Sequence, residues 1–245
     1  MFLSCNVTTW QSIIDDSQLT ESEVIDGLKT ALRIGSEKAV QITSRKDGYF
    51  ADEAIKIFLP EEANEAIRTL KQAPGGERLY EATISPIVND LVEALNRSAE
   101  DAASQAAPIF KNAITQMTIQ EAWAILKGDY KNAGNESATI YFKDKTQSDL
   151  TRLFQPAINS SLDKPLVKSL SANSIWNNFV KSYQTIEKSP ANLLMGLKPI
   201  EEPDLSRYVT TKALDGLFSK VADQEQEIRK DPYQYANQIL EKVFG

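Results

Sequence analysis

The stretch ISPIVNDLVEALNRSAEDAASQA (residues 84–106) decides the fold class of this chain. Its apolar side chains recur every three or four positions, at Ile84, Ile87, Val88, Leu91, Val92, Leu95, Ala99, Ala102, Ala103 and Ala106. This spacing places them on one face of a long α-helix that packs against a core. Ser85-Pro86 either starts this helix or kinks it, because proline has no backbone N–H to donate.

The same helical spacing recurs on both sides of this stretch. Thr20-Glu21-Ser22-Glu23 is a capping box, and an apolar stripe over residues 24–42 follows it. Thr118-Ile119-Gln120-Glu121 is a second capping box, and it opens a short helix that ends at Gly128. Further helices are predicted over residues 61–70, over 138–158 with an interruption near Pro156, over 175–183, over 209–228 and, finally, over 235–244.

One short segment departs from the helical pattern. Apolar and polar residues alternate briefly in AIKIFL (residues 54–59), just before Pro60. The chain has only 10 glycines and 10 prolines, which is few for the many turns of an all-β protein. The sequence therefore predicts an all-α protein. It would have a tail at residues 1–9, a single multi-helix domain at 10–245, and at most a short extended segment or small strand near residues 54–59.

The composition excludes several classes of chemistry. The chain has no histidine and one cysteine, so it can hold neither a Ser-His-Asp triad nor an internal disulfide, and a zinc cluster of His and Cys is excluded too. Its net charge of −7, with no dense cluster of Lys and Arg, argues against nucleic-acid binding. No run of 18 apolar residues predicts a membrane-spanning helix. We expect no cofactor and no metal.

The lone cysteine lies close to the first residue. Phe2-Leu3-Ser4-Cys5 is similar to the end of a bacterial lipoprotein signal, in which apolar and small residues precede a cysteine that receives lipid. On this interpretation Cys5 is the lipid attachment point and the protein resides in the periplasm or cell envelope. Any membrane contact would then be made only through that lipid. The alternative is a free thiol on a frayed terminus of a cytoplasmic protein.

Several segments, in order along the chain, resemble a known bacterial family. They include Gly27-Leu28-Lys29 with Gly35, Ile55-Lys56-Ile57 before Leu59-Pro60, Asn96-Arg97-Ser98-Ala99-Glu100, and the run from Tyr208 to Phe218. Together they resemble the family catalogued as domain of unknown function 4197, over roughly residues 10–245. The resemblance implies an α-helical body and an envelope address, and it supplies no catalytic residues. This chain departs from the family pattern around residues 76–87.

The residues with the greatest chemical potential surround the alanine-rich part of the long helix. Asn96 and Glu100 share a helix face, and Arg97 can pair with Glu100. With Tyr141 and Asp215 they would form a polar cluster that lines a ligand-binding pocket. The alternative is a structural hydrogen-bond network that fixes helix register, or a solvated face.

A weaker candidate is a hard-cation site. The carboxylates of Asp47, Asp52 and Glu53 flank a turn, but they lack the ligand number and spacing of a calcium loop.

Two functions from different classes follow from these residues. The first is a non-enzymatic binding or scaffold module for a partner protein or an apolar ligand, with the apolar loop at residues 193–197 as a lid or docking strip. The second is a hydrolase or lyase in which Glu100 or Asp215 acts as acid or base and Tyr141 assists. The first is favoured because the chain lacks nucleophile machinery.

Overall fold

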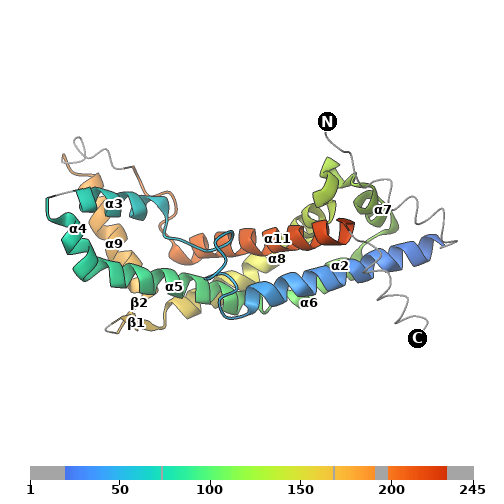
Figure 1. The fold of residues 1–245 in the computed structure, drawn as a ribbon, viewed down its shortest axis with the longest axis horizontal. Helices are drawn as coiled ribbons and strands as arrows, with labels where there is room; N and C mark the ends of the chain where they lie inside the picture. Colours follow the sequence, from blue (N-terminus) through green and yellow to red (C-terminus); the bar gives the residue numbers. More distant parts are fainter. Residues whose placement is uncertain (1–19, 73, 168, 191–197, 231–245) are drawn as a thin grey trace. The chain divides into compact units, whose positions relative to one another are not determined.

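The computed structural model describes residues 20–72, 74–167, 169–190 and 198–230, and their regular structure is almost entirely helical (Figure 1). The helices are α2 (Glu21–Ser44), α3 (Glu61–Gln72), α4 (Gly76–Leu79), α5 (Ser85–Ala103), α6 (Ala107–Gln116), α7 (Ile119–Lys127), α8 (Ser137–Leu162), α9 (Ala172–Glu187) and α11 (Leu205–Lys230). Single turns η1 (Tyr80–Ile84), η2 (Tyr130–Asn132) and η3 (Gly134–Glu136), and strands β1 (Pro165–Val167) and β2 (Leu170–Ser171), complete the described part. The predicted all-α class is confirmed.

The described residues form two compact units. Unit 1 comprises residues 20–43, 104–150 and 217–230. Unit 2 comprises residues 44–103 and 151–216, without the positions outside the described ranges. Helices α8 and α11 contribute residues to both units.

Both predicted capping boxes are present and explain where α2 and α7 begin. The amide of Thr20 donates to the Glu23 carboxylate over 2.7 Å, and the amide of Glu23 donates back to the Thr20 hydroxyl over 3.3 Å. Thr118 and Glu121 make the same reciprocal pair at the start of α7. Gly128 ends α7 with φ of 76°, a left-handed conformation that costs glycine little.

Pro86 and Pro156 each follow at least one complete helical turn, and the two cases differ. The long helix begins earlier than Ser85-Pro86, because α4 and the π-helical turn η1 lead directly into α5. The wider η1 turn gives room for the Pro86 ring against the preceding turn. At Pro156 the predicted interruption is wrong, since α8 runs through it. Phe154 and Ile158 are fully buried on either side, and their packing outweighs the lost backbone hydrogen bond.

The predicted extended segment lies between the turn at 53–55 and α3. Ile55, Ile57 and Leu59 are buried, whereas Phe58 is 49% exposed, which is the alternation of an extended chain. The described strands lie elsewhere, at β1 and β2, where Val167 pairs with Leu170 in an antiparallel hairpin. The sequence analysis did not predict this hairpin.

The core of unit 1 is built where α2, α6, α7, α8 and α11 pack together. The ring of Phe110 meets the rings of Phe142 and Phe218 edge-on, at centroid distances of 5.1 and 6.2 Å. A Cβ atom on Gly35 would come within 3.0 Å of Ile228, so glycine sets the close approach of α2 to α11.

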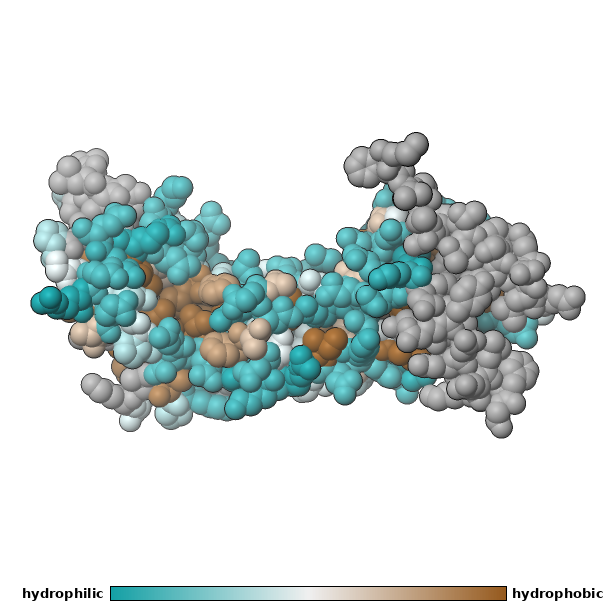
Figure 2. Space-filling view, in the orientation of Figure 1, coloured by the Kyte–Doolittle hydropathy of each residue, from teal (hydrophilic) through white to brown (hydrophobic). Residues whose placement is uncertain are grey.

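The core of unit 2 gathers α5, α9 and its parts of α8 and α11 around Tyr49, Leu95, Trp176 and Val209. The indole of Trp176 donates to the carbonyl of Pro203 over 2.8 Å, so its polar atom is satisfied in the interior. Outside the cores, hydrophilic residues cover most of the described surface on the face drawn in Figure 2. That agrees with the charged composition of the chain.

Candidate functional site

Asn96 binds the backbone of the 56–60 segment in unit 2. Its side-chain oxygen accepts from the amide of Ile57, and its side-chain nitrogen donates to the carbonyl of Ile57, both over 2.8 Å. The same nitrogen also donates to the carbonyl of Val92 within α5 over 2.8 Å. Asn96 therefore supplies the two hydrogen bonds that a neighbouring strand would give.

Glu100 binds the turn that leads into this segment. One carboxylate oxygen accepts from the amides of Tyr49 and Phe50, each over 3.1 Å, and the other pairs with Arg97 over 2.7 Å. Glu100 is only 4% exposed, so these bonds compensate for burial of its charge. Both of its oxygens are therefore used in contacts within the protein, one with the backbone of the turn and one with Arg97.

Arg97 links the buried Glu100 to the protein surface. It also pairs with Asp47 over 2.7 Å and with Glu93 over 3.1 Å. Burial on its own lowers the pKa of the Arg97 guanidinium, but the hydrogen bonds to Glu100, Asp47 and Glu93 outweigh that effect and raise it. Arg97 is therefore a permanent cation within an ion-pair network.

The other two residues of the predicted polar cluster do not join these contacts. Asp215 lies on the exposed side of α11. Tyr141 belongs to unit 1, where its hydroxyl donates to the carbonyl of Ala113 over 2.8 Å. The structure therefore brings together Asn96, Arg97 and Glu100 as a hydrogen-bond network around residues 47–57.

The three carboxylates considered as a weak candidate for a cation site bind other groups of the protein. Asp47 pairs with Arg97, and Asp52 accepts from the amide of Ala54 over 3.0 Å. Glu53 pairs with Lys56 over 3.4 Å. Within the described ranges no group of three or more His, Cys, Asp or Glu side chains is placed to hold a metal ion.

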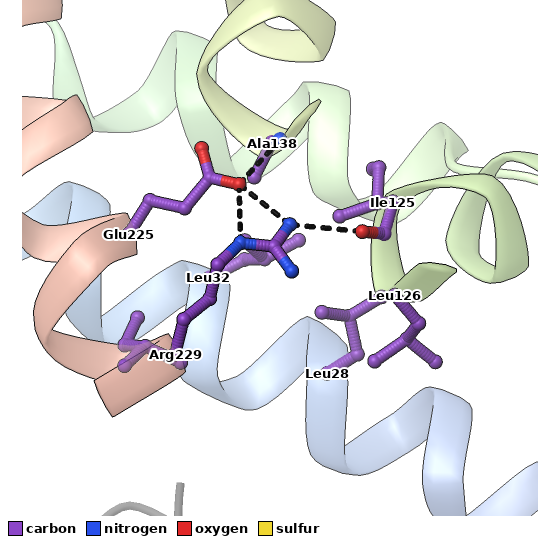
Figure 3. A pocket seen from close by; sticks show the side chains of 8 residues that line it. Leu28, Leu32, Ile125, Leu126, Ala138, Glu225 and Arg229 are labelled. Atoms are coloured by element: carbon purple, nitrogen blue, oxygen red, sulfur yellow. Dashed lines mark hydrogen bonds and ion pairs between the residues drawn. The ribbon is translucent and has the colours of Figure 1, made fainter. Parts of the chain in front are cut away.

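A second buried ion pair, in unit 1, was missed by the sequence analysis. Glu225 and Arg229 are one turn apart on α11 and approach to 2.7 Å (Figure 3). Glu225 accepts from the amides of Ala138 and Thr139, over 2.9 and 2.8 Å, and so satisfies the first turn of α8. Arg229 donates to the carbonyl of Ile125 in the last turn of α7 over 2.9 Å.

This pair matches its charges to two helix ends, with the carboxylate at an N-terminus and the guanidinium at a C-terminus. The i, i+4 spacing of Glu225 and Arg229 beside the apolar stripe of α11 was the only signal in the sequence. The cavity next to it, shown in Figure 3, has a volume of about 20 Å³ and is lined largely by leucine and isoleucine. That is room for about one water molecule.

The larger pocket of unit 1 lies between α6, α7 and α8 and contains Tyr141. Its volume is about 200 Å³. The lining comprises Ile109, Asn112, Ala113 and Gln116 from α6, Thr118 and Glu121 from the start of α7, and Tyr141, Lys145 and Asp149 from α8. Tyr141 and Ala113 are buried, whereas Asp149 and the two residues with side-chain amides, Asn112 and Gln116, are exposed. The pocket therefore has a polar rim and a partly aromatic floor.

The α8 residues of this pocket occupy one helix face, because Tyr141, Lys145 and Asp149 follow at intervals of four. The ammonium of Lys145 pairs with Glu121 over 2.7 Å and lies 5.8 Å from the centre of the Tyr141 ring. On α6, the side-chain nitrogen of Gln116 donates to the side-chain oxygen of Asn112 over 3.2 Å. The three helices thus present charged, amide and phenolic groups to a single space.

The ionisation states of Tyr141, Glu121 and Lys145 are fixed near neutral pH. Burial raises the pKa of the Tyr141 phenol, and the negative charge of Glu121 adds to this effect. Burial alone would raise the pKa of Glu121, but hydrogen bonds from Lys145 and Thr118 outweigh it and lower that pKa. The hydrogen bond to Glu121 raises the pKa of Lys145. These shifts move the pKa values of all three groups further from neutral pH, where a general acid or base works best.

Three sequence predictions fall outside the described residues. They concern lipid on Cys5, the apolar loop at 193–197 and the helix over 235–244. None of the described helices is long and apolar enough to cross a membrane.

Comparison with known proteins gives the family of the chain. A family model described as "Protein of unknown function (DUF4197)" matches residues 18–245. No curated protein matches the chain, and no solved structure does. Because the family model spans nearly the whole sequence, in agreement with the segments that resembled it, the chain belongs to the DUF4197 family.

Proposed function

We propose that this protein is a non-enzymatic binding module that holds a small polar molecule in the pocket between α6, α7 and α8. The observation that carries the proposal is the pocket itself, which has a volume of about 200 Å³ and is lined by an ion pair, two amides and a phenol. Ligand sites in proteins are concave and use a few well-placed polar groups for specificity.

The size of the described cavities favours a polar ligand over the apolar ligand expected from the sequence. Two apolar cavities lined by described residues of unit 1 have volumes of about 20 and 10 Å³. Such spaces hold about one water molecule and no hydrocarbon chain. The polar pocket, at about 200 Å³, is at least ten times larger than each of them. Its groups can replace the hydrogen bonds that a polar ligand loses with water.

A binding role also fits the chemistry better than the carboxylate hydrolase or lyase considered above. Glu100 uses both carboxylate oxygens to hold backbone and Arg97, and its residue is 4% exposed. The Tyr141 hydroxyl stays protonated and donates a hydrogen bond to the carbonyl of Ala113. Neither group is free to move a proton to or from a substrate.

We further propose that the module works in the cell envelope, anchored by lipid on Cys5. The support for this address is the Phe2-Leu3-Ser4-Cys5 sequence, which is typical of the end of a lipoprotein signal. Expression in the native host with a labelled fatty acid tests it. Label on the wild-type chain that is absent from Cys5→Ser supports the anchor, and an unlabelled wild-type chain contradicts it.

Native mass spectrometry of the full chain isolated from its own host tests the binding function. We expect a retained small molecule on the wild type. Asn112→Trp should reduce its occupancy at least tenfold, because Asn112 lines the pocket and a large ring there fills it. Lys111→Trp is the matched control, since Lys111 is also exposed on α6 but does not line the pocket. A wild type that carries no small molecule, or equal loss in both variants, would count against the proposal.

A further inference from the structure

Each charged side chain that lines the larger pocket of unit 1 already has a partner within the protein. Lys145 pairs with one carboxylate oxygen of Glu121 over 2.7 Å. The other oxygen of Glu121 accepts from the amide and the hydroxyl of Thr118, over 2.9 and 3.0 Å. Asp149 has an interaction partner within the chain as well. A charged ligand would therefore have to compete with these contacts for its counter-charge.

The pocket groups that keep hydrogen-bonding capacity for a ligand include two uncharged amides. Asn112 and Gln116 are exposed one turn apart on α6, and they share one hydrogen bond, from Gln116 to Asn112 over 3.2 Å. That bond leaves N–H groups on both side chains, and also the side-chain oxygen of Gln116, for contacts with a ligand. Lys145 adds further donors, because an ammonium has three N–H groups and the pair with Glu121 uses one.

A hydroxyl group fits this set of partners better than other neutral polar groups do. The N–H donors come from two helices, with the amides on α6 and Lys145 on α8. A hydroxyl oxygen accepts two hydrogen bonds and donates a third, whereas a carbonyl only accepts and an N–H group only donates. Resting on the function proposed above, we propose that the ligand is a neutral molecule with several hydroxyl groups, of the monosaccharide class.

The floor and the size of the pocket agree with a single sugar ring. Ile109, Ala113 and the ring of Tyr141 supply apolar surface for the C–H groups of a sugar. The hydroxyl of Tyr141 is already used, because it donates to the carbonyl of Ala113 over 2.8 Å. The volume of about 200 Å³ is below the range for drug-sized ligands, which begins at about 300 Å³, and it suits one ring.

Chemical-shift mapping of the ¹⁵N-labelled full chain tests the ligand class. The neutral probes are glucose, galactose, mannose, N-acetylglucosamine and myo-inositol, and the charged probes are glucuronate, glucosamine and free amino acids. We expect at least one neutral probe to shift the amide signals of residues 109–121 and 141–149, and to bind more tightly than any charged probe. Because it forms no ion pair, its Kd should change less than twofold between about 0.02 and about 0.5 M NaCl.

A substitution that removes one amide locates the sugar in the pocket. Gln116→Met keeps the length of the side chain but loses its donors and its acceptor. It should raise the Kd of the tightest neutral probe at least fivefold, which is about the effect of one net hydrogen bond. Gln120→Met makes the same change at an exposed position of α7 that does not line the pocket, and it should leave the Kd within twofold of wild type.

The possible results separate this inference from the proposed function. A charged probe that binds in the pocket at least as tightly as every neutral one overturns the monosaccharide class and leaves the proposed function standing. Equal rises in Kd for Gln116→Met and Gln120→Met would show that the amide does not hold the sugar, and they overturn the inference too. If no probe shifts the pocket signals, the inference is refuted. The proposed function is then decided by native mass spectrometry, which detects a retained molecule of any class.

Discussion

Replacing Glu225 by glutamine should destabilise unit 1 far more than an isosteric change normally does. The carboxylate takes donors on both of its oxygens: Ala138 and Arg229 on one, Thr139 on the other. Glutamine keeps the shape but turns one of these oxygens into an NH₂ donor. Whichever way the amide is oriented, one side of it then meets only donors.

The magnitude follows from what is left unpaired. A buried donor without a partner costs about 1–3 kcal/mol, and breaking a buried ion pair by removing one partner costs about 3–5 kcal/mol in all. Glu225 and the Arg229 side chain are 4% and 11% exposed, so solvent screens the loss little. We therefore expect Glu225→Gln to lower the free energy of unfolding by about 3–5 kcal/mol, out of a typical total of about 5–15 kcal/mol.

Amide hydrogen exchange is the assay of choice, because it reports opening at the site itself. The amides of Ala138 and Thr139 should exchange about 10²- to about 4 × 10³-fold faster in Glu225→Gln, since each 1.4 kcal/mol is about tenfold. Glu227→Gln makes the same chemical change at an exposed position of α11 and should alter exchange less than about threefold. Equal, small effects of the two substitutions would refute the buried-pair argument.

Three further predictions concern other contacts. Asn96→Leu should lower the free energy of unfolding, measured by urea denaturation, by about 2–4 kcal/mol, because the buried N–H and carbonyl of Ile57 lose their partner. The control Asn178→Leu, on the exposed side of α9, should change it by less than about 0.5 kcal/mol. Similar values for the two substitutions would contradict the role of Asn96 as the hydrogen-bond partner of the Ile57 backbone. Gly216→Ala should lower the melting temperature, since the new Cβ would lie 2.7 Å from the buried ring of Tyr49 and overpacking costs about 1–3 kcal/mol. The control Gly27→Ala, which has nothing within 4 Å of the new Cβ, should raise the melting temperature. Changes of the same sign in the two variants would be evidence against the close contact at Gly216. The pKa of Glu121 is lowered on folding, so its contribution to stability is present above the unfolded pKa of about 4.3 and is lost as pH falls through the folded value. Glu121→Gln should therefore be less stable than wild type at about pH 7 and equal to it at about pH 2, as measured by chemical denaturation; a difference that grows in acid would reverse the sign of the argument.

The helices could be predicted because local chemistry specifies them. Thr20 with Glu23, and Thr118 with Glu121, mark helix starts by side chain to backbone bonds that need no tertiary context. Gly128 marks an end by its left-handed conformation. Pro156 was misjudged because its effect depends on tertiary packing, which holds α8 together through Phe154 and Ile158.

The candidate sites, too, could be predicted only where their residues are close in the sequence. Asn96, Arg97 and Glu100 were found because they are neighbours on one helix, yet their partners lie some 40 to 50 positions away in the chain, and spacing alone could not show that those partners are backbone groups. Lys145 and Glu121 come from separate helices, so their pairing was invisible before the fold was known. Tyr141 was predicted as a site residue and does line a pocket, but with groups that the sequence analysis did not connect to it.

The most direct test of the central claim is a crystal structure of the full chain purified from its own host with any bound small molecule retained. The account predicts ligand density in the pocket of unit 1, in contact with Tyr141, Lys145 and Gln116. It also predicts that the Asn96–Arg97–Glu100 network binds only protein. Density for a small molecule against Arg97 and Glu100, with only solvent beside Tyr141, would contradict it.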